Sequence, residues 1–380
     1  MRRLLAILFL AVLTSACGGG GESVSSEGSG TDVADTAAAD DTATADDTAT
    51  TAPPETTTAP STTTTVATTT TTEAPTAVSQ VPTPEASTVA DLLSLDRPVV
   101  AAHGGGDRSY PHSTMYAFVE AALAGTDVLE MDLQMTADGV LVVHHDATVD
   151  RRTEATGRVR DLTVVELQEL DKAHWFHDRG EERDLPDDQY PFRGMRTGDV
   201  EPPAGYTADD FKIETFRTLA ETFPDHVLDL EIKVPLDDDG ENDIAYAIEA
   251  ARVLAAAIEE LDRTDSVIVT SFSSDVMIAF REFAPEVATS PGEDEMVAWY
   301  LGAGEIAEQD VLAQLPPERI GIDILDPELI ARIQAEGIGL WIWPNSDDQE
   351  NEAFYRSLFE LGIDGVIAGV PAEGVAAALG

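Results

Sequence analysis

The sequence is poor in cysteine and in basic residues. Its 380 residues include a single cysteine, Cys17, so the chain cannot form an internal disulfide framework or a cysteine-rich zinc site. It carries 22 Lys and Arg against 72 Asp and Glu, a formal charge of −50, and only three of the basic residues are lysines. Nucleic-acid binding depends on clusters of Lys and Arg against phosphates. The composition therefore argues against a nucleic-acid partner.

Long apolar runs are also missing, but the N-terminus carries a short one. Arg2 and Arg3 precede an apolar run over residues 4–13, and small residues lead from it to Cys17. This order is typical of a secretory signal, and the run is too short to span a bilayer. Residues 13–17 resemble a bacterial lipobox, in which the cysteine is lipidated. We expect residues 1–17 to be a lipoprotein signal peptide that leaves the protein outside the cytoplasm, anchored to the membrane at Cys17. An ordinary signal and a secreted protein are the alternative.

Residues 18–90 are of low complexity, rich in Thr, Ala, Asp and Pro. They contain eleven acidic residues and no Lys or Arg. Such a segment has too little apolar surface to offset its chain entropy, and its charge and prolines keep it extended. The pattern predicts a disordered tether between the signal peptide and a folded part over residues 91–380.

The folded part alternates between apolar runs and amphipathic segments. Strand followed by helix, repeated, is typical of a parallel sheet covered by helices, and this length suits one (β/α)₈ TIM barrel of the α/β class. A polar stretch rich in Pro and Gly, residues 172–210, predicts an inserted loop region. The runs expected to form strands are 99–102, 128–133, 140–143, 227–232, 267–270, 320–324, 339–343 and 365–367.

Polar residues interrupt several of these runs at or near their ends. His103 follows the first, and His145 follows the third. Glu130 and Asp132 stand two apart in the second, and Glu231 and Lys233 share the same spacing in a later run. Alternate residues of a strand share a face, so each pair points the same way. Two carboxylates on one face repel each other, and a bound cation would relieve that repulsion. In a barrel, catalytic groups lie at the carboxyl ends of the strands.

These residues fall in a pattern that resembles the glycerophosphodiester phosphodiesterase family, whose members are TIM barrels. The matching segments keep their order and spacing over most of residues 98–371: 102–105, 113–118, 125–132, 136–139, 143–146, 230–233, 270–272, 341–345 and 362–367.

The resemblance implies a role for each matching position. His103 and His145 would be the acid–base pair, and Lys233 would contact the substrate phosphate. One divalent cation, Ca²⁺ or Mg²⁺, would be held by three carboxylates, Glu130, Asp132 and Glu231. It also implies site-lining positions at Gly104, His112, Trp343 and Asn345. The implied reaction is metal-dependent hydrolysis of a glycerophosphodiester to glycerol 3-phosphate and an alcohol. The oligomeric state stays open.

Three positions depart from the family pattern. The family usually has an arginine where this chain has Gly104, a glutamate in place of His112, and often an aspartate in place of Gly369. Loss of the arginine removes a bidentate phosphate contact that a lysine does not replace. Arg108 and Arg151 are candidates to compensate.

Two alternative functions follow from these departures. The first is a lysophospholipid or sphingolipid phosphodiesterase of the same fold, with an apolar entrance formed by Trp175, Phe176, Tyr190 and Phe192 of the insertion. The second is a lipid-anchored protein that binds glycerophosphodiesters without hydrolysing them.

Overall fold

A computed structural model describes residues 76–380. The predicted signal peptide, Cys17 and the predicted tether as far as residue 75 lie outside the described residues. Residues 76–90 were expected to belong to the tether, but the structure packs them against the barrel. Ala77 and Ala86 are buried, and the backbone N–H of Ala77 donates to the carbonyl of Gly205 at 3.0 Å. The folded part therefore extends upstream of residue 91.

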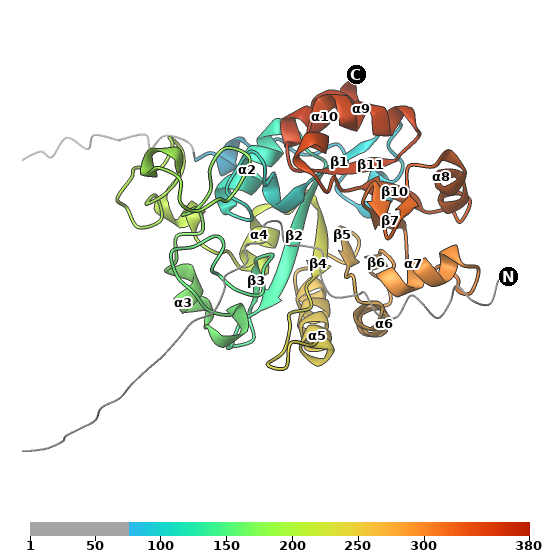
Figure 1. Ribbon diagram of the computed structural model, residues 1–380, viewed down its shortest axis with the longest axis horizontal. Helices are drawn as coiled ribbons and strands as arrows, with labels where there is room; N and C mark the ends of the chain where they lie inside the picture. Colours follow the sequence, from blue (N-terminus) through green and yellow to red (C-terminus); the bar gives the residue numbers. More distant parts are fainter. Residues whose placement is uncertain (1–75) are drawn as a thin grey trace, which may run out of the picture. The chain divides into compact units, whose positions relative to one another are not determined.

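The described residues form a (β/α)₈ barrel (Figure 1). Within residues 76–380, eight parallel strands stand in the order β6-β5-β4-β2-β1-β11-β10-β7. Their bounds are β1 Val99–Ala102, β2 Val128–Met135, β4 Val227–Ile232, β5 Val267–Thr270, β6 Ala288–Thr289, β7 Leu312–Leu315, β10 Gly339–Ile342 and β11 Gly365–Ala368.

A short parallel bridge closes the ring between β6 and the residues that precede β7. Thr289 pairs with Asp310, and Val311 donates its backbone N–H to the Thr289 carbonyl at 2.9 Å. Arg281 ties the junction from outside, because its guanidinium lies 2.7 Å from an Asp310 carboxylate oxygen.

Helices cover the outside of the ring, one after nearly every strand. Most begin at a Thr, Ser, Asp or Asn whose side chain accepts from an early backbone N–H of the helix, as at Thr114 and Asn351. Their bounds are α1 Val89–Leu92, α2 Met115–Ala124, α3 Val164–Gln168, α4 Phe216–Thr222, α5 Ile244–Glu260, α6 Ser274–Phe283, α7 Glu293–Tyr300, α8 Pro327–Gln334, α9 Glu352–Glu360 and α10 Pro371–Leu379. Within residues 76–380, no helix is both long and apolar enough to cross a membrane.

The predicted barrel is confirmed, but two of the eight predicted barrel strands were wrong. Residues 141–143 form β3 (Leu141–Val143), which pairs antiparallel with β2 outside the ring. The 320–324 run lies in a hairpin of β8 (Glu318–Arg319) and β9 (Ile322–Asp323). The missed barrel strands are β6, with two residues, and β7, which carries the polar Gln314. Both lack the apolar run that marks a strand in a sequence.

The barrel interior changes from apolar to acidic along the strands. At the amino end, α1 packs on a cluster that includes Val128, Val227 and Trp341. Two residues further along β2 stands Glu130, and two residues beyond Val227 on β4 stands Asp229. Because alternate residues share a face, the same interior faces that bury valine at one end present carboxylates toward the other.

The insertion, residues 172–210, forms no α-helix or β-strand in the structure. Its aromatic side chains pack on one another and on helix α2, because Phe192 contacts Tyr116 of α2 and Phe176 at ring distances of 5.1 and 5.6 Å. Phe176 and Tyr190 are buried, and the Trp175 indole N–H donates to the Thr153 carbonyl. The aromatic side chains expected to form an apolar entrance therefore pack within the insertion and against the barrel residues beside it.

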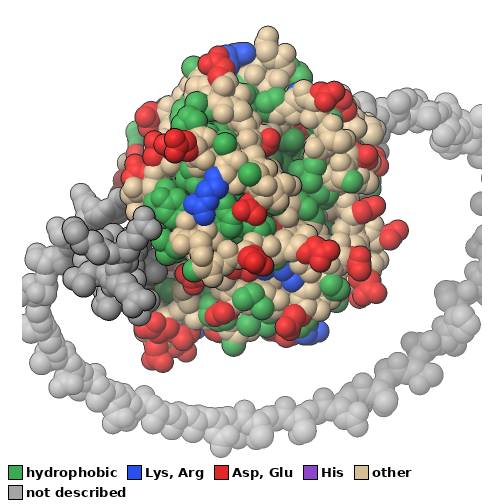
Figure 2. Space-filling model, turned by 90° about the vertical axis from the view of Figure 1, so that its right-hand side faces the viewer, with side chains coloured by type: hydrophobic (Ala, Val, Ile, Leu, Met, Phe, Trp, Pro, Cys, Tyr) green, Lys and Arg blue, Asp and Glu red, His purple; other side chains and the backbone are tan. Residues whose placement is uncertain are grey.

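The surface is acidic and carries its charge in a dispersed form. Figure 2 shows one face, where acidic side chains are scattered and Lys and Arg are few. Such a surface repels other anions over about a Debye length of 8–10 Å at ordinary salt. Binding of an anionic phosphodiester then depends on local positive charge inside the site.

Candidate active site

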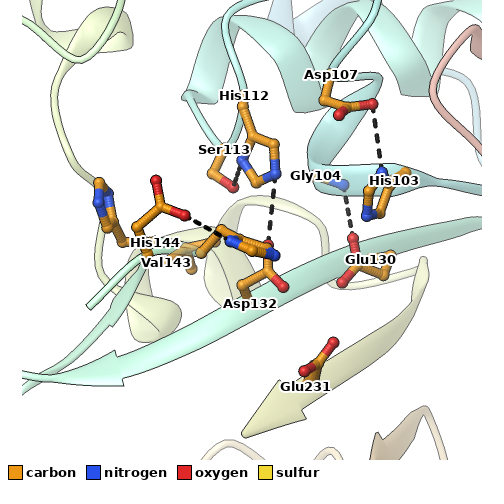
Figure 3. Close-up of polar contacts among 12 residues, drawn as sticks. His103, Gly104, Asp107, His112, Ser113, Glu130, Asp132, Val143, His144 and Glu231 are labelled. Atoms are coloured by element: carbon orange, nitrogen blue, oxygen red, sulfur yellow. Dashed lines mark hydrogen bonds and ion pairs between the residues drawn. The ribbon is translucent and has the colours of Figure 1, made fainter. Parts of the chain in front are cut away.

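Strands β2 and β4 bring the predicted carboxylates together at the carboxyl end of the barrel (Figure 3). Their register sets Asp132 of β2 directly opposite Glu231 of β4, and Glu130 opposite Asp229. Glu130, Asp132 and Glu231 each offer an oxygen, and these atoms lie within 4.8 Å of one another. The cluster has the size and the all-oxygen chemistry of a site for a hard divalent cation.

Neighbouring charges change the pKa values of the carboxylates in this cluster. Burial, followed by the Asp132 charge, raises the pKa of Glu130 well above its usual range, although His103 and the Gly104 N–H act in the opposite direction. Burial also acts against ionisation of Asp132, but Lys233 and both predicted catalytic histidines hold its pKa below its usual range. Crowded acids of this kind gain stability from a bound cation. The residues present therefore fit a divalent metal.

Lys233 lies within the carboxylate cluster. Its ammonium nitrogen is 2.8 Å from Asp132 Oδ1 and 2.8 Å from Glu231 Oε1. Burial acts against its charge, but the two carboxylates raise the pKa of Lys233 above its usual range. The lysine thus brings a fixed positive charge to the place where the resemblance expects a phosphate.

The two predicted catalytic histidines face the cluster from the loops after β1 and β3. His103 Nδ1 lies 3.3 Å from Asp107 Oδ1, and His145 Nδ1 lies 2.8 Å from Asp146 Oδ1. Asp146 is held in turn by the Arg151 guanidinium at 2.7 Å. Each imidazole has its Nδ1 on a carboxylate, which leaves Nε2 for a second partner.

His112 stands between these two histidines, with its ring centre 6.0 Å from each of theirs. It is buried, its Nδ1 lies 2.6 Å from the Ser113 hydroxyl, and its Nε2 lies 3.5 Å from Asp132 Oδ2. Burial, followed by the nearby cations, lowers its pKa well below the usual range. The imidazole is therefore neutral.

Gly104 and His112 are complementary in shape. Gly104 has φ +51°, and a Cβ added to it would lie 2.6 Å from Cε1 and Nε2 of His112. The Ser113 N–H also donates to the Gly104 carbonyl at 2.7 Å. The two departures from the family pattern thus occur as a pair, because the imidazole fills the space beside the missing side chain.

Neither candidate for replacing the missing arginine is free to do so. Arg108 pairs with Asp347 at 3.2 Å and donates to the Arg179 carbonyl, and Arg151 holds Asp146. The other predicted lining positions lie on the far side of the barrel. Trp343 packs edge-on against Phe272 at 6.2 Å, and Asn345 is exposed, with its backbone N–H donating to Gln349.

Sequence analysis assigned no role to three acidic residues near the site, Asp107, Asp229 and Glu350. Asp229 is fully buried and accepts from Gln314 across the barrel at 2.9 Å. Burial, followed by the neighbouring acids, raises its pKa to about 7 against the effect of that hydrogen bond. Asp107 and Glu350 come from loops without periodicity. Of the three, only Asp229 could be recognised in the sequence, because it lies two residues before Glu231 on the same face of β4.

A family model describes the same region of the chain. Residues 103–373 match the glycerophosphoryl diester phosphodiesterase family. The chain is similar to a glycerophosphodiester phosphodiesterase of Bacillus subtilis, 26% identical over 294 residues that cover 75% of this chain and 88% of that one. It is also similar to glycerophosphodiester phosphodiesterase 1 of Bos taurus, 41% identical over 92 residues, 24% of this chain and 28% of that one.

Solved structures share the fold. The glycerophosphoryl diester phosphodiesterase domain of a Mycobacterium tuberculosis protein matches with a TM-score of 0.57 at 18% identity, over 74% of this chain and 98% of that one. An Oleispira antarctica phosphodiesterase, solved with the product sn-glycerol-3-phosphate, matches with a TM-score of 0.52 at 19% identity, over 74% and 96%.

Proposed function

Because the chain belongs to the glycerophosphoryl diester phosphodiesterase family, we propose that it hydrolyses glycerophosphodiesters to sn-glycerol 3-phosphate and an alcohol. The observation that carries this proposal is the convergence at one barrel end of two carboxylate-bound histidines, a carboxylate triad and one lysine. Phosphodiester hydrolysis requires acid–base groups and stabilisation of charge on phosphate oxygens, and this set contains groups for both.

One divalent cation, Ca²⁺ or Mg²⁺, would be held by Glu130, Asp132 and Glu231. When bound, such an ion stabilises the charge that develops on a non-bridging phosphate oxygen. The buried carboxylates fix its place, and Lys233 adds a second positive charge beside Asp132 and Glu231. With no arginine at position 104, phosphate binding depends on these two charges.

We assign the acid to His103 and the base to His145. Burial acts against a charge on His103, but Asp107, Glu130 and Asp132 raise its pKa to about 10, so it holds a proton for the leaving alcohol oxygen. His145 has its Nδ1 on Asp146, and its Nε2 would accept the proton of the attacking hydroxyl, from water or from the glycerol 2-hydroxyl. The new P–O bond forms as the bond to the leaving oxygen breaks, and that oxygen takes the proton of His103. With water as the nucleophile, the product is glycerol 3-phosphate. With the glycerol 2-hydroxyl as the nucleophile, the product is a cyclic phosphate, and a water must then form a P–O bond as the bond to the 2-oxygen breaks and that oxygen takes a proton.

A substrate panel tests the proposal. The chain would be assayed for the phosphomonoester and the alcohol released from small glycerophosphodiesters, lysophospholipids and sphingolipids, with Ca²⁺, Mg²⁺ or chelator. The phosphomonoester is glycerol 3-phosphate for the small diesters and a lipid phosphate for the other two. Metal-dependent release from the small diesters supports the proposal. Release from the lipids alone moves the substrate class to the first alternative. Binding of these compounds without any turnover replaces hydrolysis by the second.

We also propose that the protein acts outside the cytoplasm, anchored to a membrane through a lipid on Cys17. The support is the order of charge, apolar run and small residues before that cysteine. Metabolic labelling with a fatty acid in a bacterial host would label the chain but not its Cys17→Ser variant. Equal labelling, or full release of the parent chain into the medium, would contradict the anchor.

A further inference from the structure

The histidines of the site obtain their carboxylate partners in different ways. Asp146 directly follows His145 within the family pattern, whereas Asp107 stands four residues beyond His103 in the loop after β1 (Figure 3). Two backbone bonds fold this loop back, because Gly106 and Asp107 both donate their N–H to the His103 carbonyl, at 2.7 and 3.0 Å. The fold-back brings Asp107 Oδ1 to 3.3 Å from His103 Nδ1.

Three consecutive glycines make this turn possible. Gly104, Gly105 and Gly106 have φ of +51°, +80° and +98°, in the left-handed region that residues with a Cβ rarely adopt. Gly104 also donates its N–H to Glu130 Oε2 at 2.6 Å. One end of the turn is thereby attached to the carboxylate cluster through Glu130, and the other end carries Asp107.

A glycine after β11, Gly369, leaves the space that Asp107 occupies. A Cβ added to Gly369 would lie 2.6 Å from Asp107 Oδ1, 2.7 Å from Arg108 Cγ and 2.9 Å from Glu350 Oε1. The backbone of Gly369 fastens the same groups, because its carbonyl accepts from the Arg108 N–H at 3.0 Å. A side chain at position 369 would displace Asp107 from this place.

Glu350 packs behind Asp107. It is buried, and its Oε2 accepts from the Gly369 N–H at 2.9 Å and from the Tyr355 hydroxyl. Burial and then the Asp107 charge raise the pKa of Glu350 to about 7, although its hydrogen bonds act in the opposite direction. Its hydrogen bonds hold Glu350 in place, so it forms a fixed wall on that side of the Asp107 carboxylate.

We propose that Asp107 is the positioning residue for His103. Gly369 leaves the space for the Asp107 carboxylate, and Glu350 bounds that space on one side. The Asp107 carboxylate keeps a proton on His103 Nδ1 and turns Nε2 toward the phosphodiester, much as the aspartate of a serine protease orients its histidine. This inference rests on the proposed function, because it concerns the acid of that reaction. It also gives a physical reason for the glycine at position 369.

The test compares Asp107→Asn with the parent chain over a range of pH. Asparagine keeps the shape but removes the charge. We expect kcat to fall about 10- to 100-fold, less than the loss of the imidazole itself, with KM within about twofold. The alkaline limb of the rate profile should move to lower pH, because the protonated form of His103 loses its carboxylate. Glu130, Asp132 and the ring of His112 also face His103 and are unchanged by the substitution.

Gly369→Ala provides a second variant that leaves Asp107 in the chain. It should lower kcat to a similar extent, and the double variant should lose little more than either single one, because both disrupt the same contact. Asp347→Asn is the matched control. Its carboxylate is exposed and pairs with Arg108 of that loop and not with a histidine, so activity should stay unchanged.

A spectroscopic measurement separates this inference from the proposed function. In ¹⁵N-histidine spectra, assigned with His103→Gln, the parent chain should show the His103 proton on Nδ1, and Asp107→Asn should change that signal. A parent chain that hydrolyses no phosphodiester overturns the proposed function. An active parent, with Asp107→Asn unchanged in kcat, pH profile and His103 signal, overturns this inference alone.

Discussion

The two arcs of the barrel carry different chemistry. The first arc, β1, β2 and β4 with the loops that follow them, supplies both histidines, the carboxylate triad and Lys233. The second arc, β5 to β11, places Thr270 opposite Glu231 and Gln314 against Asp229, and carries Phe272 and Trp343 on its rim. The first arc thus holds the groups assigned to catalysis in the proposed function, and the second carries aromatic side chains on its rim.

Under the proposed function, this difference separates the catalytic groups from those that select the substrate. The charged groups of the first arc can act on the phosphate that every phosphodiester substrate shares. The aromatic side chains of the second arc can contact only what extends beyond that phosphate. We therefore expect substitutions in the first arc to change kcat, and substitutions in the second to change KM according to the leaving group.

The largest expected effect comes from removal of the base. His145→Ala should lower kcat about 10²- to 10⁴-fold, the range that acid–base catalysis contributes, and leave the fold intact. Steady-state rates and a circular dichroism melt check both parts. His174→Ala is the control, because that histidine lies in the insertion beside Asp171 and Trp175. Normal turnover by His145→Ala would remove His145 from the mechanism.

Removal of the metal tests the carboxylate triad. Without Ca²⁺ and Mg²⁺, turnover should cease and the melting temperature should fall, because a ligand at about 100 times its Kd stabilises the folded state by about 2.7 kcal/mol. Glu231→Gln should abolish this thermal shift at the same metal concentration. Turnover in chelator, or an equal shift in Glu231→Gln, would contradict the metal site.

A stability measurement tests the pairing of Gly104 with His112. Gly104→Ala should lower the free energy of unfolding by about 1–2 kcal/mol for its left-handed φ, and by about 1–3 kcal/mol more for the overlap with the imidazole. Gly139→Ala is the matched control, with φ +78° and no atom within 4 Å of the added Cβ. If urea unfolding gave the same loss of unfolding free energy for Gly104→Ala and Gly139→Ala, the contact between position 104 and His112 would not contribute to stability.

The second arc should produce the smallest effects. Phe272→Ala or Trp343→Ala should raise KM about three- to tenfold for substrates with apolar leaving groups, equivalent to about 1 kcal/mol, with kcat unchanged. Substrates with small polar leaving groups should be little affected. Phe283→Ala, exposed on α6 outside the barrel, is the control. A fall in kcat for every substrate would abolish the distinction between the arcs.

The sequence predicted the first arc better than the second. Glu130 and Asp132 lie on one apolar strand, so period-two spacing was enough to expect them on one face. Their grouping with Glu231 was implied by the family resemblance, and the pairing of β2 with β4 accounts for it. In the second arc, β6 is too short and β7 too polar to be predicted as a strand from the sequence. The apolar run over residues 320–324, which was predicted as a barrel strand, forms a hairpin outside the ring.

The remaining contacts depend on loops that have no periodicity. Glu350 approaches Asp107 from the segment before α9, far along the chain, and Gly369 matters for the volume it leaves free. A local sequence pattern cannot predict that a glycine of one loop leaves space for a side chain of another loop. Gly104 and His112 were visible only as two separate departures, and their contact is a property of the folded loop.

The most direct test of the division between the arcs measures glycerol 3-phosphate release by the parent chain, His145→Ala and Phe272→Ala, with saturating Mg²⁺ or Ca²⁺ and a small glycerophosphodiester. The account predicts metal-dependent release by the parent chain, almost none by His145→Ala, and an unchanged kcat for Phe272→Ala. Equal rates for the parent chain and His145→Ala would contradict it.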